Sequence, residues 1–191
     1  APRLAVQAES ENLDKGGMSF HALPAFSTYA RKSYWIDIYN QGTGELNWSV
    51  ASSDDWILIS QKSGKTSTEN RIHISVNWDK VPVGEKVKGQ IDITSGNQKE
   101  SVLVSVFNPE SPARDELQGL YVEENGYISI PAADFHRKFE SNDIQMNILA
   151  GLGFEGRSLQ LGNPTAPLQM YRAGDVPRVE YDFYTFNAGI Y

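Results

Sequence analysis

Hydrophobic and polar residues alternate over much of the first half of the chain. In a β-strand successive side chains point to opposite faces, so an alternation with a period of two predicts strands that bury one face. The clearest stripe consists of Ile72, Ile74, Val76 and Trp78. On this basis we expect strands over residues 33–40, 46–50, 56–59, 72–78, 91–93 and 102–106. Short strands separated by turn residues are typical of an immunoglobulin-like β-sandwich, which we expect over residues 1–110.

Three tryptophans are predicted to lie in the core of this first domain. Trp48 and Trp78 share their phase with aliphatic residues, and Trp56 opens a continuous apolar run. An aromatic ring in the apolar phase of a strand contributes a large buried area. The run itself, Trp56–Ile59, predicts a strand that is covered on both faces.

The second half of the chain opens with a predicted helix and continues with strands. Residues 111–119 are expected to form a short linking helix. Ser111 suits its cap, Pro112 its first position and Gly119 its end. Beyond it, the apolar pattern predicts strands over residues 120–122, 127–130, 144–148, 158–161 and 179–186. The chain is therefore predicted to be all-β, with a second domain over residues 120–191.

Composition excludes several classes of partner. The 191 residues carry a net charge of -7, whereas nucleic acid requires a patch of lysine and arginine. The absence of cysteine excludes a disulfide scaffold and a thiolate metal site. No apolar run has the length that a bilayer span requires, so we expect no membrane insertion.

A glycine motif resembles the dinucleotide-binding fingerprint. Gly151-x-Gly153-x-x-Gly156 has the spacing, and Asp175 follows about twenty residues later. That site also requires a helix whose N-terminus faces the pyrophosphate. The residues after Gly156 instead alternate and then reach Pro164, so we expect the glycines to form a tight corner between two strands.

Paired carboxylates suggest glycosidase chemistry, but their placement does not fit it. Glu180 and Asp182 would share one face of a strand at about 7 Å, a separation found in inverting glycosidases. Those enzymes need carboxylates on opposite sides of the scissile bond, and Arg178 on the same face can neutralise both. Glu123 and Glu124 lie beside a loop and are expected to be solvated.

The remaining polar residues indicate no catalytic centre. His21, His73 and His136 are scattered without metal-ligand spacing, and no serine lies in a nucleophile elbow. We therefore predict no catalytic residue, no metal site and no cofactor in this chain.

The most promising binding residues are Trp35, Asp37 and Tyr39. They alternate with Ile36 and Ile38, so two rings and a carboxylate are expected on one face of a strand. Such a face could stack and hydrogen-bond a sugar. The alternative is that the strand is central, with both faces buried, and that this face meets another domain.

Four blocks of the second half resemble one known family. They resemble the C-terminal β-sandwich of glycoside hydrolase family 115, α-glucuronidases that act on glucuronoxylan. The blocks are Gly126–Ile130, Asp134–Lys138, Gly151–Ser158 and Val179–Phe186. In the first half, the motifs Leu46-x-Trp48, Trp56-Ile57-x-Ile59-Ser60 and Gly89-x-Ile91-x-Ile93 resemble Ig-like modules of Bacteroides glycan-degrading proteins.

The resemblance implies a partial galactose-binding-like (jelly-roll) sandwich over residues 120–191. About five strands are predicted where such a domain usually has about eight, so we expect it to be truncated relative to the family. Where related sandwiches often carry Glu-Ala-Glu and bind calcium, this chain has Pro131-Ala132-Ala133, which offers no oxygen side chains. We therefore expect no calcium.

The resemblance further implies a non-catalytic region of a secreted or periplasmic xylan α-(4-O-methyl)glucuronidase. Its role would be domain packing, positioning or dimerisation. The expected partners are the upstream catalytic domain, a second copy of the chain and a plant polysaccharide. Two alternatives are a carbohydrate-binding module for plant cell-wall glycans and an Ig-like surface interaction protein.

Overall fold

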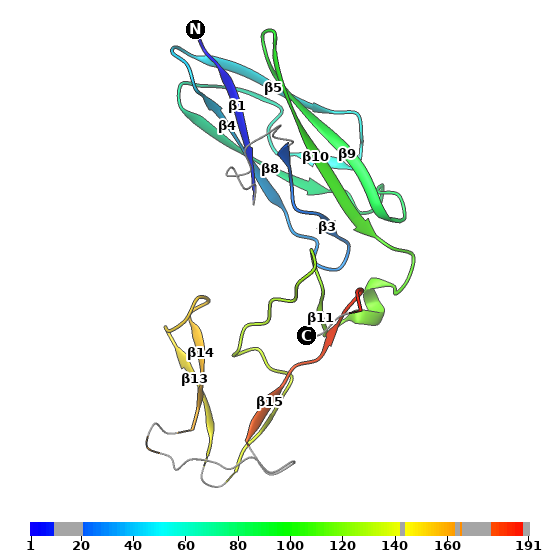
Figure 1. The fold of residues 1–191 in the computed structure, drawn as a ribbon, viewed down its shortest axis with the longest axis vertical. Helices are drawn as coiled ribbons and strands as arrows, with labels where there is room; N and C mark the ends of the chain where they lie inside the picture. Colours follow the sequence, from blue (N-terminus) through cyan, green and yellow to red (C-terminus); the bar gives the residue numbers. More distant parts are fainter. Residues whose placement is uncertain (10–20, 142–143, 163–164, 166–176, 189–191) are drawn as a thin grey trace. The chain divides into compact units, whose positions relative to one another are not determined.

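The computed structural model describes residues 1–9, 21–141, 144–162, 165 and 177–188 (Figure 1). The chain divides into two compact units, Ala1–Gln118 and Gly119–Tyr191. Strands are the main regular secondary structure among the described residues of both units, which confirms the predicted all-β class. Among the described residues no helix is long and apolar enough to cross a membrane.

The first unit contains two sheets. One is antiparallel, in the order β1-β4-β8-β6, and consists of β1 (Leu4–Ala8), β4 (Tyr34–Asn40), β8 (Glu69–Val76) and β6 (Ile57–Ile59). The other has the order β2-β10-β9-β5-β7, and β3 also pairs with β10. Its strands are β2 (His21–Ala22), β3 (Phe26–Ser27), β5 (Leu46–Ser52), β7 (Ser63–Thr66), β9 (Gly84–Ser95) and β10 (Gln98–Asn108).

A single hydrophobic core joins these sheets. The alternating residues Ile36, Ile38, Ile72 and Ile74 enter it from the first sheet, and Ile91, Ile93, Val102, Val104 and Val106 enter it from the second. Each sheet buries one face in this way, as in a two-layer β-sandwich (Figure 1). The apolar residues that alternate with a period of two in the sequence are thus the residues that form the core.

Two details of the first unit differ from the prediction. Leu58 in β6 is 44% exposed, so this strand is covered on one face and not on both. β6 is the last strand in the order of its sheet and pairs with β8. Trp78 lies beyond the end of β8 and is only partly buried against the core.

The predicted linking helix is shorter than expected. It is a 3-10 helix, η1 (Arg114–Leu117), and its N-cap is Ala113, so Ser111 and Pro112 precede it. The carboxylate of Glu116 accepts a hydrogen bond from the Ala113 N–H at 3.0 Å. This local bond satisfies the helix start without a serine cap.

The described strands of the second unit form three two-stranded sheets. The pairs are β11 (Tyr121–Val122) with β16 (Phe183–Tyr184), β12 (Arg137–Phe139) with β15 (Arg178–Glu180), and β13 (Met146–Ala150) with β14 (Arg157–Leu161).

Two strand predictions for the second unit are wrong. The expected strand over 179–186 is two strands, since β15 pairs with β12 whereas β16 pairs with β11. No strand spans 127–130, where Tyr127 forms only an isolated bridge with Glu124. Asn125 and Gly126 both have positive φ, 52° and 84°, and close a tight turn there.

Candidate functional site

Trp35, Asp37 and Tyr39 lie on the outer face of β4, opposite in phase to the buried Ile36 and Ile38. The register therefore brings the three predicted residues onto one surface of the first sheet. All three are half-buried. Whether this surface binds a sugar depends on what already contacts each side chain.

Arg71 of β8 engages two of the three residues. It is directly opposite Asp37 and donates from Nε to Oδ1 and from Nη2 to Oδ2, each at 2.7 Å. Its guanidinium carbon also lies 3.9 Å from the centroid of the Trp35 ring. The hydrogen bond to Asp37 raises the pKa of Arg71. One face of Trp35 and the Asp37 carboxylate are therefore occupied within the protein itself.

Tyr39 has a different environment. Ala5 of β1 faces it on one side and Glu69 of β8 on the other. Its side chain makes no hydrogen bond and no ring contact with any residue that the structure describes. Of the three predicted residues, Tyr39 is the one whose ring stays available.

Two surface hollows meet at Tyr39. The first has a volume of about 480 Å³ and is also lined by Arg3, Ala5 and Gln41. The second has a volume of about 540 Å³ and is lined by residues from β1, β4 and the start of β8.

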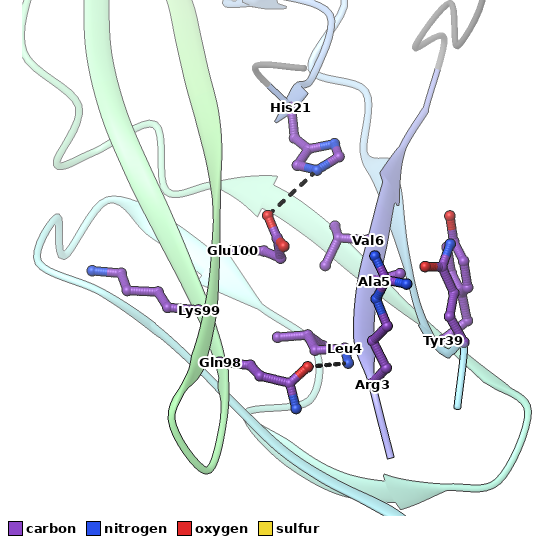
Figure 2. A pocket seen from close by; sticks show the side chains of 10 residues that line it. Arg3, Leu4, Ala5, Val6, His21, Tyr39, Gln98, Lys99 and Glu100 are labelled. Atoms are coloured by element: carbon purple, nitrogen blue, oxygen red, sulfur yellow. Dashed lines mark hydrogen bonds and ion pairs between the residues drawn. The ribbon is translucent and has the colours of Figure 1, made fainter. Parts of the chain in front are cut away.

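In the wall of the first hollow, contacts connect β1 and the second sheet. The Gln98 side-chain oxygen accepts a hydrogen bond from the Leu4 N–H at 2.9 Å, and His21 Nε2 lies 3.7 Å from the Glu100 carboxylate. Figure 2 shows these contacts on one side of β1 and Tyr39 on the other. The floor of the hollow is thus held by both sheets.

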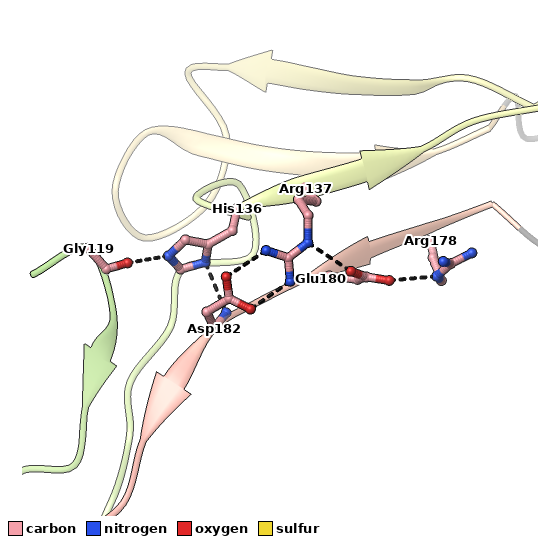
Figure 3. A network of polar contacts seen from close by, with 6 residues as sticks. All are labelled: Gly119, His136, Arg137, Arg178, Glu180 and Asp182. Atoms are coloured by element: carbon pink, nitrogen blue, oxygen red, sulfur yellow. Dashed lines mark hydrogen bonds and ion pairs between the residues drawn. The ribbon is translucent and has the colours of Figure 1, made fainter. Parts of the chain in front are cut away.

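The carboxylates of Glu180 and Asp182 belong to an arginine network in the second unit (Figure 3). Arg137 donates from Nε to Glu180 at 2.9 Å and from both terminal nitrogens to Asp182 at 2.6 Å each. Arg178 Nε donates to the other oxygen of Glu180 at 2.9 Å. The sequence pointed to Arg178, whereas the larger contribution comes from Arg137, which cross-strand pairing places opposite Glu180.

This network makes the pair unsuitable for glycoside hydrolysis. Hydrogen bonds from Arg137, and for Glu180 also from Arg178, hold the pKa of both carboxyls below their usual range. A glycosidase acid needs a raised pKa to keep its proton at neutral pH. Neither carboxyl can supply that proton.

His136 joins three segments of the same unit. Its Nδ1 accepts the Asp182 backbone N–H at 3.0 Å, and its Nε2 lies 2.6 Å from the Gly119 carbonyl oxygen (Figure 3). These contacts fit a neutral imidazole that carries its proton on Nε2. Its ring also packs edge-on against Tyr121, with centroids 5.2 Å apart. The arrangement is structural, with both nitrogens occupied.

Glu123 is not solvated as predicted, since it is only 5% exposed. Its carboxylate accepts hydrogen bonds from the Asn187 side-chain amide at 2.6 Å and from the N–H groups of Asn187 and Phe186 at 3.0 and 2.7 Å. These bonds, the first above all, lower its pKa. Their partners lie 63 and 64 residues away, a separation that a local pattern does not reveal.

The glycine motif forms the turn of the β13–β14 hairpin, as predicted. Gly151, Gly153 and Gly156 have φ of 80°, 82° and 70°, and the Gly151 N–H donates to the Gly156 carbonyl at 2.7 Å. Asp175 lies outside the described residues. In the described ranges, no group of three His, Asp or Glu residues is arranged to hold a metal ion.

Two family models match the chain. Residues 25–107 match the viral BACON domain, and residues 120–191 match the glycosyl hydrolase family 115 C-terminal domain. No curated protein matches the chain.

Several solved structures are similar to parts of the chain. A Bacteroides ovatus family 5 xyloglucanase has 18% identity and a TM-score of 0.37 over 61% of this chain and 21% of the enzyme. A Clostridium perfringens family 123 glycoside hydrolase has 14% identity and a TM-score of 0.35 over 63% and 30%. The surface-layer protein SbsC, domains 1–6, has 13% identity and a TM-score of 0.38 over 96% and 26%.

All three TM-scores lie below 0.5, so the family models carry the assignment and the structural similarities do not. The chain also spans only about a fifth of the xyloglucanase. The match over residues 120–191 agrees with the blocks that resemble family 115 in sequence. The match supports the assignment of residues 120–191 to a C-terminal region of glycosyl hydrolase family 115.

Proposed function

We propose that this chain is an accessory region that packs against and positions the catalytic domain of a family 115 xylan α-(4-O-methyl)glucuronidase. The match of residues 120–191 to the C-terminal domain of that family carries the proposal. A domain of this kind is non-catalytic in itself. The neutralised pair Glu180 and Asp182 is consistent with such a role.

The β13–β14 hairpin offers a surface for this packing. Its apolar side chains Ile148, Leu152, Phe154 and Leu161 are exposed, and Phe154 at the turn is fully so. Exposed apolar side chains that cluster on one element mark protein interaction sites, because covering them removes apolar surface from water. We therefore place the contact with the catalytic domain on this hairpin.

A binding measurement tests this role. The chain would be titrated into the purified catalytic domain of a family 115 α-glucuronidase, with calorimetric detection. Phe154→Asp should weaken binding about tenfold or more, because loss of a buried aromatic anchor commonly costs over about 2 kcal/mol. Leu103→Asp, at an exposed apolar position of the first unit, serves as the matched control and should leave the affinity unchanged.

Absence of binding by the unmodified chain would contradict the proposal. A second copy of the chain is the other occupant that this hairpin could accept. Light scattering separates the two, since a dimer that Phe154→Asp dissociates would assign the hairpin to self-association.

An activity assay tests the non-catalytic assignment. We expect the chain to release no uronic acid from glucuronoxylan at high protein concentration over several hours. Turnover that disappears in Glu180→Gln or Asp182→Asn would overturn this expectation.

A further inference from the structure

The outer face of the first sheet carries the aromatic ring of Tyr39, which lies on β4. Tyr39 is half-buried at the junction of two hollows, and its side chain has no hydrogen-bond or ring partner among the described residues. Trp35, two residues earlier on the same face, has the Arg71 guanidinium over its ring. The ring available to a ligand is therefore Tyr39.

The cross-strand neighbours of Tyr39 explain why there is room beside it. Ala5 lies directly opposite on β1. Directly opposite residues in a sheet have Cβ atoms about 5 Å apart, so a methyl group at this position leaves the side of the phenol ring uncovered. Ala5 and Tyr39 both line the hollow of about 480 Å³.

Polar residues line both of the hollows to which Tyr39 contributes. Arg3 and Gln41 belong to the first hollow. Gln7, Ser67 and Glu69 belong to the second hollow, of about 540 Å³. None of these five side chains forms a hydrogen bond with a residue that the structure describes. Both volumes lie within the range of ligand sites, about 300–1,000 Å³.

The aromatic ring and the polar residues together indicate the class of ligand. Amides, a hydroxyl, a carboxylate and a guanidinium suit groups that both donate and accept hydrogen bonds, as sugar hydroxyls do. The face of the phenol ring is electron-rich and attracts the C–H groups on the flat side of a pyranose. A phosphate-rich ligand is disfavoured by the net charge of -7.

We propose that Tyr39 is the stacking platform of an oligosaccharide site on the first unit. One sugar ring lies on Tyr39 beside Ala5, and its neighbours along the glycan occupy the two hollows. Arg3 donates hydrogen bonds to either a hydroxyl or the carboxylate of a uronic acid. Glu69 accepts hydrogen bonds from hydroxyls at the other end of the site. This site is independent of the hairpin contact proposed above, which involves the second unit.

The test is a titration of the isotope-labelled whole chain, followed by amide chemical shifts. The probes are xylohexaose and an aldotetraouronic acid that carries 4-O-methylglucuronic acid. Saturable shifts are expected in residues 3–7, 39–41 and 67–69. Tyr39→Ala should weaken binding about tenfold or more, because the sugar loses the ring on which it stacks, and Tyr39→Phe should retain most of the affinity.

Controls separate this site from others and from loss of folding. Trp35→Ala should leave the affinity unchanged, and so should Phe154→Asp, which affects only the hairpin contact. Ala5→Trp, which fills the hollow, should abolish binding while thermal unfolding shows that the variant is folded. Arg3→Gln should weaken binding of the acidic probe more than of the neutral one if Arg3 receives the carboxylate, and equally if it receives a hydroxyl.

Two results would overturn the proposal. The first is the absence of saturable shifts with both probes at millimolar concentration. The second is binding that Tyr39→Ala leaves intact or that Trp35→Ala removes, which would place the ligand elsewhere on the sheet.

Discussion

At the scale of single residues, the tryptophans of the first unit show that cross-strand neighbours decide whether a ring is buried in the core or lies on an outer face. Trp48 is 3% exposed and lies directly opposite Gly64 on β7. A Cβ atom at Gly64 would collide with the Trp48 ring, so the glycine provides the space that the ring fills. Trp35, on an outer face, is instead covered by Arg71.

We predict unequal costs for truncating these two rings. Trp48→Ala should lower the free energy of unfolding by about 3–5 kcal/mol, because it empties a large volume in a close-packed core. Trp35→Ala should cost less, about 1–2 kcal/mol, because a half-exposed ring loses less burial and one cation–π contact. Denaturant unfolding of both variants measures the difference. Equal losses would show that Trp35 is as important to the core as Trp48.

Glu123 gives a prediction with a defined pH dependence. Its folded-state pKa is lowered, so its contribution to stability is complete above the ordinary glutamate pKa of about 4.3 and is lost as the pH falls through the lower folded-state value. Glu123→Gln should cost about 1–3 kcal/mol at neutral pH, because the amide keeps one acceptor oxygen and its NH2 group then faces a donor of Asn187 or Phe186.

The measurement is unfolding of the second unit, followed by hydrogen exchange at residues 121–123 and 183–187, at pH 7 and pH 3. The difference in the free energy of unfolding between Glu123→Gln and the unmodified chain should be smaller at the lower pH. A difference that stays constant would show that the charge of Glu123 does not contribute. Glu124→Gln, at the adjacent carboxylate, serves as the control.

At the scale of elements, the two units use strands in different ways. The sheets of the first unit face a shared core, so each strand is stabilised by both hydrogen bonds and burial. In the described part of the second unit, strands pair two by two, and the β12–β15 pair is joined by the Arg137 network. An isolated exposed ion pair contributes little, whereas one arginine that bridges two carboxylates also relieves their mutual repulsion.

We predict that Arg137→Met loosens the β12–β15 pair specifically. Without the guanidinium, Glu180 at the end of β15 and Asp182 just beyond it repel each other, because Arg137 no longer bridges them. Amides of residues 137–139 and 178–180 should exchange faster, while those of β13 and β14 should not change. High salt should reduce the effect by screening the repulsion. Lys138→Met removes a neighbouring ion pair with Glu140 and provides the control.

At the scale of the whole molecule, the extent of burial differs between the units. All residues of the continuous hydrophobic core lie in the first unit. In the described part of the second unit, the buried hydrophobic residues are Ala133, Ile144 and Met146. Two-stranded sheets with little apolar burial are marginally stable. The first unit is therefore the stable body of the chain.

We predict that residues 1–118 fold without the remainder. The fragment should show the same thermal transition as the first unit within the whole chain, whereas the second unit should unfold at a lower temperature. Calorimetry of both proteins, with hydrogen exchange to assign the transitions, provides the measurement. A single transition in the whole chain that shifts when residues 119–191 are removed would contradict this prediction.

Much of the fold could be predicted from the sequence because its signals are local. Period-two patterns located most strands of the first unit, since the same alternation that appears in the sequence separates core from surface in a two-layer sandwich. The glycine spacing at 151–156 predicted a strand corner for the same reason, because positive φ is a property of the residue and its immediate neighbours.

What the tertiary structure decided depends on partners distant in the chain. Arg71 is 34 residues from Asp37, Arg137 is 45 from Asp182, and Asn187 is 64 from Glu123. These pairings cover Trp35, neutralise the acidic pair and bury Glu123, and they leave Tyr39 uncovered beside Ala5. In the first unit, the sequence alone indicated most of the strands and which of their faces points outward. Only strand pairing decided which outward-facing side chains contact other residues of the protein. The reason is that pairing depends on contacts between distant segments and not on the hydrophobic pattern within one segment.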